Sequence, residues 1–148
     1  MKAKWWVAAL AAVALLWAAA ALASRGLTGY GPVLRANWGV SIPAAAGCRQ
    51  VYEADSGPSP FGDGLRCHVF TAARPERLLV MAAWRAPTAE EQAQAENLLD
   101  RLLVTPEFWP EDGRCLFWSA GGESDPRDEL LLFLDEERGL LYVLESFL

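Results

Sequence analysis

Lysine and histidine are almost absent from this sequence. The only lysines, Lys2 and Lys4, precede the first apolar run, and His68 is the single histidine among 148 residues. Nucleophilic catalysis by a serine or cysteine would therefore depend on His68, and no G-x-S-x-G motif accompanies it. We expect His68 to be a packed or surface residue of a strand, and we assign no catalytic residue.

Solenoid repeats, heptads and a collagen pattern are also absent. The length suits one domain, and a hydrophobic content of 53% with a mean hydropathy of +0.11 excludes a disordered chain. After the two lysines, eleven arginines face nineteen acidic residues, which gives a formal charge of −8. Such a domain repels the phosphates of nucleic acid, so nucleic acid is not an expected partner. Its net charge also predicts no gain from anionic lipid headgroups.

Residues 5–23, WWVAALAAVALLWAAAALA, form a 19-residue run without a charge. As a helix this run would span roughly 28 Å, close to the ~30 Å hydrocarbon core of a bilayer. Trp5 and Trp6 stand where interfacial aromatic residues occur. The basic groups are densest before the run, so residues 1–4 are predicted to be cytoplasmic and the domain extracytoplasmic. We therefore expect a single-pass transmembrane helix, with the lipid bilayer as its partner.

A cleaved signal peptide is the alternative for the same run. Ala21-Leu22-Ala23 before Ser24 has the small-x-small pattern of a cleavage site, and cleavage would release a secreted soluble domain. The apolar core of a signal peptide usually spans about 7–15 residues, which is shorter than this run and favours the anchor. Cys48 is the first cysteine and lies too far from the run for a lipoprotein anchor.

A flexible tether over residues 24–32, with three glycines and a proline, is predicted to lead into one α+β domain over residues 33–148. Pro32 can begin a short helix that ends at Gly39. A second helix is expected over 75–84. A third is expected over 89–103, because it starts with a capping box and carries an apolar stripe.

Five strands complete the predicted domain, as an antiparallel sheet in the chain order β-β-α-α-β-β-β. Their expected spans are residues 49–55, 65–71, 114–119, 129–135 and 140–147. The last two would be joined by a turn with Gly139 in the left-handed conformation. The run Leu130–Leu134 is apolar at every position, which indicates a strand that is covered on both faces or meets a partner.

Several stretches resemble a known group of proteins. They are Gly39-Val-Ser-Ile-Pro43, Val51-Tyr52-Glu53, Phe61-Gly62-Asp63-Gly64, Trp84-Arg-Ala-Pro87 and, after a leucine strand into Asp135, Leu141-Tyr142-Val143-Leu144-Glu145. In these stretches the chain is similar to uncharacterised small single-pass membrane proteins of Gram-positive anaerobic bacteria. The resemblance implies an anchored α+β domain and brings no known activity.

Three cysteines, Cys48, Cys67 and Cys115, could form a disulfide outside the cytoplasm. The expected hairpin register places Cys67 opposite about Tyr52, which is too far from Cys48 for a disulfide. We therefore expect buried thiols. A zinc site would need Cys67 and His68 together, but adjacent residues of a strand point to opposite faces. We assign no metal and no cofactor.

Acidic residues in loops or at strand ends are the oxygen ligands that a calcium site would use. They are Asp55, Asp63, Asp125, Asp128 and Glu129. The sequence lacks the D-x-D-x-D-G spacing of a calcium loop, and Asp63-Gly64 and Asp125-Pro126 are typical of turns. The same acids offer no assignable carboxylate pair for glycoside hydrolysis.

Four tryptophans follow the anchor, and we expect them to pack in the core. They are Trp38, Trp84, Trp109 and Trp118. If the helices all lie on one side of the sheet, its other face would expose large side chains. Phe133, Tyr142 and Trp118 are the candidate interaction face for this case.

The sequence thus predicts a membrane-anchored, non-catalytic extracytoplasmic domain that binds a ligand or serves as an accessory module of the cell envelope. An envelope protein is a candidate partner. The alternatives are a small envelope hydrolase with unassigned acidic residues and a secreted soluble domain after cleavage at Ala23.

Overall fold

The computed structural model describes residues 29–57, 64–123 and 125–147. Two α-helices, three 3₁₀ helices and five strands follow one another in these ranges. They are α2 (Gly31–Trp38), η1 (Ala44–Ala46), β1 (Cys48–Asp55), β2 (Gly64–Ala72), η2 (Pro75–Met81), α3 (Ala89–Arg101), η3 (Pro106–Phe108), β3 (Leu116–Gly121), β4 (Glu129–Asp135) and β5 (Leu140–Phe147). The strands form one antiparallel sheet in the order β1-β2-β5-β4-β3, which confirms the α+β class and the five-stranded sheet.

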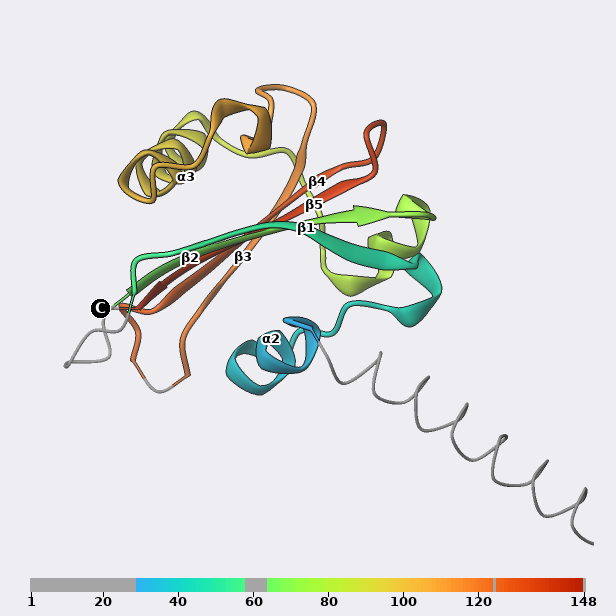
Figure 1. The fold of residues 1–148 in the computed structure, drawn as a ribbon, viewed down its shortest axis with the longest axis horizontal. Helices are drawn as coiled ribbons and strands as arrows, with labels where there is room; N and C mark the ends of the chain where they lie inside the picture. Colours follow the sequence, from blue (N-terminus) through green and yellow to red (C-terminus); the bar gives the residue numbers. More distant parts are fainter. Residues whose placement is uncertain (1–28, 58–63, 124, 148) are drawn as a thin grey trace, which may run out of the picture.

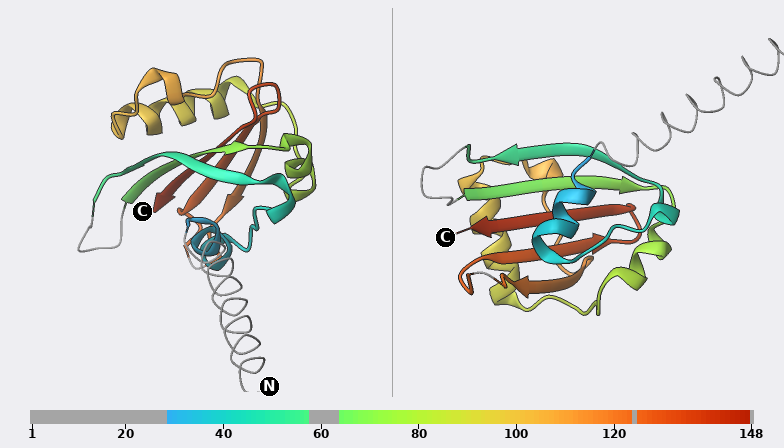
Figure 2. Two further views of the ribbon diagram at one scale, coloured as in Figure 1. Left: turned by 45° about the vertical axis from the view of Figure 1, so that its right-hand side comes forward. Right: turned by 90° about the horizontal axis from the view of Figure 1, so that it is seen from below.

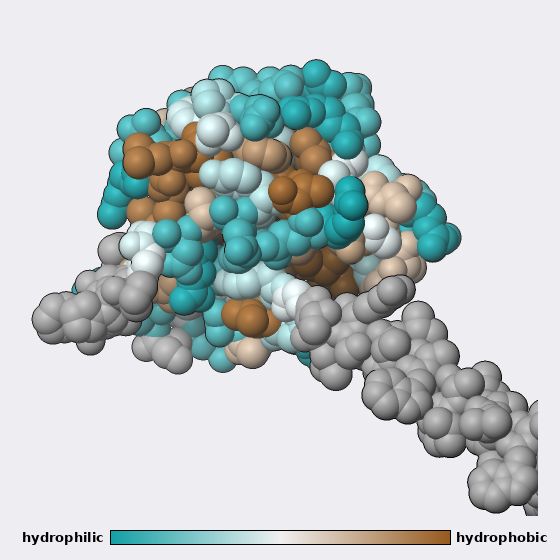
Figure 3. All heavy atoms as spheres, in the orientation of Figure 1, coloured by the Kyte–Doolittle hydropathy of each residue, from teal (hydrophilic) through white to brown (hydrophobic). Residues whose placement is uncertain are grey.

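Helices cover both faces of this sheet (Figure 1 and Figure 2). α3 lies on one face, and α2, η1 and η2 lie on the other. Each face has its own core of buried apolar residues, which we call the α3-side core and the α2-side core. The outer side of the α3 layer is hydrophilic, as the top of Figure 3 shows. The fold is therefore a three-layer arrangement with the sheet in the middle.

Strand β4 contributes to both cores, which explains its uninterrupted leucine run. Leu130, Leu132 and Leu134 belong to the α2-side core, whereas Leu131 and Phe133 belong to the α3-side core. All five are at most 1% exposed. The alternation of a strand therefore places apolar side chains in two separate layers, and no partner protein is needed to cover them.

Helix α3 begins with the predicted capping box. The Thr88 hydroxyl accepts from the Glu91 N–H at 3.2 Å, and the Glu91 carboxylate accepts from the Thr88 N–H at 2.8 Å. At the other end, Leu103 adopts a left-handed conformation with φ 54°. The Leu103 N–H bonds to Asp100 and the Val104 N–H bonds to Leu99, which is the pairing of a Schellman motif. Both ends of α3 are thus closed by local hydrogen bonds.

The first hairpin contains a β-bulge that the sequence did not reveal. The register shifts by one residue between Gln50 and Tyr52, and Cys67 lies opposite Ala54 instead of Tyr52; the bulge accounts for one residue of this difference and the position of the turn for the other. Cys48 lies opposite Ala72 at the far end of the hairpin, and all three cysteines are free thiols. The second hairpin has the predicted Gly139 conformation, with φ 63°.

Two predicted elements differ from the structure. Residues 75–84 form the 3₁₀ helix η2 only as far as Met81, and Ala82 is extended, so that Arg85 can bridge to Phe117 at the edge of β3. The third strand starts two residues later than expected, because the Arg114 N–H bonds to the Glu111 carbonyl in a turn.

Some predictions lie outside the described residues. They concern the run 5–23, the tether as far as residue 28, and the hairpin turn with Asp63. Within the described ranges, none of the helices has both the length and the apolar character needed to cross a membrane.

Candidate functional site

Helix α2 contacts the sheet through Tyr30, Leu34 and Trp38, which are spaced by four residues and therefore share one side of the helix. Leu34 is fully buried in the α2-side core. Tyr30, at the N-cap, stacks on the ring of His68, with ring centroids 3.5 Å apart. At the other end, the indole N–H of Trp38 donates to Oε1 of Glu145. Each end of α2 thus rests on an ionisable residue of the sheet.

His68 lies on β2 beneath Tyr30 and is 7% exposed. Both ring nitrogens are buried and have no hydrogen-bond partner among the described residues. Its neighbours across the strands are Glu53 on β1 and Val143 on β5. Loss of solvation lowers the pKa of His68 to about 4, and the opposing attraction of Glu53 is the smaller effect. The ring is therefore neutral at physiological pH.

Glu145 lies on β5 and is fully buried. One carboxylate oxygen accepts from Trp38, while Oε2 has no partner among the described residues. Its cross-strand neighbour Arg66 is turned away, because it pairs with Asp55 at 3.1 Å and lies over the Phe147 ring. Burial raises the pKa of Glu145 to about 7. A raised pKa is also a property of general acids, but this side chain has no exposed surface through which it could meet a substrate.

A pocket of about 400 Å³ opens beside the N-terminal end of α2, and we call it the α2 pocket. Its lining residues come from the start of α2, the segment around η1, and strands β1 and β2. They are Gly29, Tyr30, Gly31, Pro32, Ile42, Pro43, Ala44, Gly47, Cys48, Arg49, Gln50 and Phe70. The lining carries apolar and polar surface in comparable amounts and contains no carboxylate. A pocket of this size can hold a small ligand.

A second pocket, of about 370 Å³, lies at the start of α3. Its lining includes Thr88, Gln92, Glu96 and Asp112. The capping box satisfies the N–H groups of Thr88 and Glu91, and the carboxylates of Glu96 and Asp112 in the lining oppose an anionic ligand. The α2 pocket is the better candidate for a ligand.

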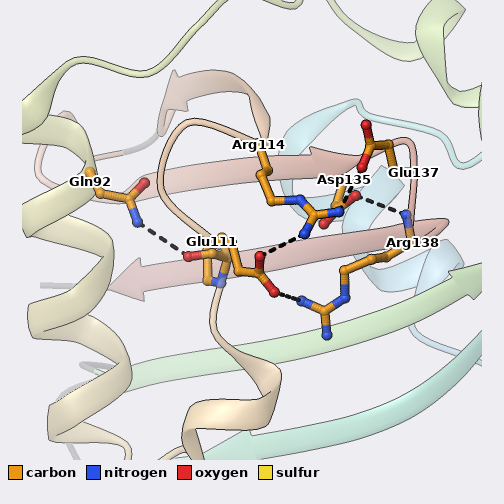
Figure 4. A network of polar contacts seen from close by, with 7 residues as sticks. Gln92, Glu111, Arg114, Asp135, Glu137 and Arg138 are labelled. Atoms are coloured by element: carbon orange, nitrogen blue, oxygen red, sulfur yellow. Dashed lines mark hydrogen bonds and ion pairs between the residues drawn. The ribbon is translucent and has the colours of Figure 1, made fainter.

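A polar network centred on Glu111 lies on the α3 side of the sheet and includes Asp135 (Figure 4). The Asp135 carboxylate is fully buried, and its Oδ1 accepts from the Arg138 N–H at 2.9 Å. Glu111 joins Arg138 at 2.9 Å to Arg114 at 3.0 Å, and Arg114 also contacts Glu137 at 2.6 Å. These bonds tie the segment before β3 to the β4–β5 turn. The network therefore has a structural role.

Two reactive side chains lie near this network but are not activated. Burial raises the pKa of the Tyr142 hydroxyl to about 12 and that of the Cys115 thiol to about 11. Burial likewise raises the pKa of Cys67 to about 12. These groups are protonated at physiological pH, so neither thiol is a ready nucleophile.

The predicted interaction face is wrong. Phe133 and Tyr142 are fully buried beneath α3, and Trp118 packs against the α2-side core on the opposite face of the sheet. The prediction assumed that the helices share one side, whereas they cover both. The tryptophans have structural roles, as expected: Trp84 donates to the Leu78 carbonyl and Trp109 to the Val104 carbonyl.

Three of the acids considered for calcium have arginine or amide partners in the described residues. Asp55 pairs with Arg66, Asp125 with Arg127 at 2.7 Å, and Glu129 accepts from Gln94. In the described part of the chain, no group of three or more metal-ligating side chains comes together.

Sequence reasoning overlooked one signal for this site. Glu145 falls in the alternation of Leu141 and Val143, at an inward position of an otherwise apolar strand. An acid at such a position is either paired or has a shifted pKa.

Comparison with known protein families, curated proteins and solved structures gives no match for this chain. The resemblance stated from the sequence therefore stays a prediction.

Proposed function

We propose that this chain is a single-pass membrane protein whose extracytoplasmic domain binds a ligand, without catalysis, in the α2 pocket. The observation that carries the proposal is the pocket itself, an open pocket of apolar and polar lining with Arg49, Gln50 and Cys48 at its wall. Apolar walls supply affinity and a few polar groups supply orientation. The membrane anchor and the topology rest on the apolar run 5–23 and the basic residues before it.

The sheet itself offers little binding surface, which supports the choice of the pocket. Both faces are covered by helices. The outer edge of β3 is bridged by Arg85, whose N–H and carbonyl bond to Phe117 at 3.0 and 2.6 Å. The β1 edge carries a bulge and the exposed charges of Arg49, Glu53 and Asp55, features that oppose strand addition.

A non-catalytic role is consistent with the groups in the pocket. Cys48 is the nucleophilic side chain in the pocket lining, and burial raises the pKa of its thiol. The hydrolase alternative would instead need Glu145, which lies beneath α2 and is fully buried. It would therefore require α2 to leave the sheet.

Photo-crosslinking in growing cells tests the pocket. A photoreactive amino acid at Ala44, which lines the pocket, is expected to give one discrete adduct. The same amino acid at Ala36, which is exposed on α2 outside the pocket, is the matched control. Gln50→Trp narrows the pocket and is expected to abolish the adduct at residue 44. Equal adducts at both positions, or none at either, would contradict the proposal.

Labelling of Ser24→Cys tests the topology. A membrane-impermeant thiol reagent is expected to react in intact cells, and the unsubstituted chain gives the background from its own cysteines, of which Cys67 and Cys115 are buried. Reaction only after lysis would place the domain in the cytoplasm.

The intact mass distinguishes the anchor from the secreted alternative, since cleavage after Ala23 would leave a chain that begins at Ser24.

A further inference from the structure

The charges of this chain are segregated along the fold. Fifteen of the nineteen acidic residues lie in 89–148, which form α3, β3, β4 and β5 with their loops. No acidic residue precedes Glu53, so α2, η1 and the start of β1 carry only the positive charges of Arg35 and Arg49. The acidic residues that give the domain its negative net charge are therefore concentrated in residues 89–148, and the segments from α2 to the start of β1 are basic.

The 3₁₀ helices η1 and η2 lie side by side on the α2 side of the sheet. The Arg74 N–H bonds to the Ala46 carbonyl at 3.0 Å, and the Ala73 N–H to the Gly47 carbonyl at 3.4 Å. Five exposed side chains mark this surface, which we call the shoulder: Arg49, Arg74, Arg77, Leu79 and Val80. It combines an excess of positive charge with exposed aliphatic groups.

Val80 is 83% exposed and Leu79 is 40% exposed, next to the buried Leu78 that fixes η2 on the sheet. The nearest acid on this element is Glu76, which lies 4.0 Å from Arg77 with both side chains 60% exposed. Glu76 offsets one of the three arginine charges of the shoulder, and the three arginines with Glu76 keep a positive net charge. Arginines beside exposed aliphatic residues are typical of surfaces that lie in the headgroup region of a bilayer.

The shoulder also lies close to the point where the chain leaves the domain toward its N-terminus. Gly29 and Tyr30 line the α2 pocket together with Ala44 of η1, and η1 contacts η2. Residues 24–28 can span at most roughly 18 Å. An anchor at 5–23 would therefore hold the shoulder near the membrane surface.

Most of the acidic surface lies away from the shoulder; the exception is the β4–β5 turn, whose exposed Glu136 and Glu137 lie at the same end of the sheet, near Pro75 at the start of η2. Helix α3 lies on the far face of the sheet (Figure 1). The acidic β3–β4 loop begins where Gly121 pairs with Glu129, at the end of the sheet opposite to η1 and η2. Attraction at the shoulder and repulsion at the other surfaces would thus favour one orientation.

We propose that the shoulder rests on the surface of the lipid bilayer in which residues 5–23 are anchored, with Leu79 and Val80 among the headgroups and Arg74 and Arg77 against anionic lipids. This inference rests on the membrane anchor of the proposed function. It replaces the expectation, drawn from net charge alone, that anionic headgroups bring no gain. The α2 pocket, which is lined in part by Ala44 of η1, then opens at the membrane surface.

The test uses the full chain reconstituted in vesicles of phosphatidylcholine with phosphatidylglycerol. An environment-sensitive dye is attached to Val80→Cys or to Leu103→Cys. These two positions are matched, because Val80 is 83% and Leu103 is 85% exposed, and they lie on opposite sides of the sheet. Spin-labelled lipids are expected to quench the dye at residue 80 and not at residue 103, with the unsubstituted chain as background.

Charge reversal tests the electrostatic contribution. Each arginine near an anionic surface contributes roughly a five-fold factor to binding, so Arg74→Glu with Arg77→Glu is expected to lower the ratio of docked to undocked domain by roughly 25-fold. Arg101→Glu and Arg127→Glu, on the α3 layer and the acidic loop, form the control pair and should leave quenching at residue 80 unchanged. In vesicles without phosphatidylglycerol, a chain that keeps Arg74 and Arg77 should show quenching at residue 80 as weak as that of the Arg74→Glu, Arg77→Glu variant.

The outcomes separate this inference from the proposed function. If the chain does not float with the vesicles, the anchor fails and the inference falls with it. If the chain floats and both dyes escape quenching, the anchor stands and the shoulder proposal is overturned. Equal quenching at both positions overturns it as well, because the domain would then have no preferred orientation. A dye at residue 80 that is shielded from water without lipid quenching indicates a protein contact and also overturns the proposal.

Discussion

Helix α3 has thirteen residues, a capping box and a Schellman motif, whereas α2 has eight residues and no side-chain cap. α3 buries Ala95, Leu98 and Leu99. α2 buries only Leu34, and its two ends rest on His68 and Glu145. The α3 layer is thus held mainly by apolar burial, together with the polar network around Glu111. The docking of α2 depends in addition on the protonation of two buried groups, so the two layers should respond differently to the same perturbation.

The largest effect is expected from Phe133→Glu, in the α3-side core. Phe133 is fully buried and packs on Phe117, with ring centroids 4.9 Å apart. A carboxylate there would lose its solvation without gaining a partner, so we expect a loss of more than about 4 kcal/mol and no cooperative thermal transition. Leu103→Glu, at an exposed site of the same layer, is the control and should change stability by no more than about 0.5 kcal/mol. Cooperative melting of Phe133→Glu would show that the α3-side core is not closed.

Truncation of one leucine in each layer tests whether the layers are independent. Leu34→Ala and Leu99→Ala both remove fully buried side chains, and each should cost about 3 kcal/mol. For Leu99→Ala we expect the midpoint of global unfolding to fall. For Leu34→Ala we expect local release of α2, seen as faster amide exchange and proteolysis in 29–47, before the sheet unfolds. Identical exchange patterns in the two variants would remove the distinction between the layers.

The pH dependence of the α2 layer has two opposing parts. The folded state raises the pKa of Glu145 from its usual 4.5 to about 7, so this residue costs stability as pH rises from 4.5 to 7. The folded state lowers the pKa of His68 from 6.5 to about 4, so this residue costs stability as pH falls from 6.5 to 4. Between about 4.5 and 6.5 the two slopes oppose each other, and the stability of the unsubstituted chain should be nearly flat.

Single substitutions should show separately how His68 and Glu145 make the stability depend on pH. Glu145→Gln leaves the His68 part, so the stability of this variant should rise by about 3 kcal/mol between pH 4 and 6.5. His68→Gln leaves the Glu145 part, so its stability should fall by a similar amount between pH 4.5 and 7. Denaturant titrations at several pH values measure both. Parallel profiles for the two variants would show that these groups do not control the α2 layer.

The smallest effect is expected at the end of α3. Leu103 has φ 54° and is 85% exposed, so its side chain contributes little packing while its backbone is strained. Leu103→Gly should stabilise the domain by up to about 1 kcal/mol, since glycine adopts this conformation without the steric penalty. A thermal melt measures the gain. The neighbouring Leu102→Ala serves as control, because Leu102 packs partly against the α3-side core and its truncation should destabilise.

The elements with strong local signals were predicted well from the sequence. The spans of β4 and β5 are correct at both ends, because apolar runs are bounded there by Glu129, Asp135 and Gly139. The start of α3 at Ala89 follows from the capping box, and the end of α2 follows from Gly39, which has φ 67°. In each case a few neighbouring residues determine the geometry.

Features that depend on distant contacts could not be predicted. The bulge at Val51 follows from the pairing of β1 with β2, and the shortening of 75–84 to η2 follows from the bridge of Arg85 to β3. The contact between Trp38 and Glu145 joins residues 107 apart in the chain. The division of the helices between two faces is likewise a tertiary property, which is why the interaction face of Phe133, Tyr142 and Trp118 was wrong.

The place of β5 in the sheet has a consequence for how the protein is made. β5 ends at Phe147, yet it lies between β2 and β4, and it supplies buried residues to both cores. Neither core can close before β5 has been synthesised and has paired with β2 and β4. A chain that has made only β1 to β4 therefore leaves a gap at the centre of the sheet, with its apolar residues exposed on both faces. The position of one strand thus sets the order in which synthesis and folding occur.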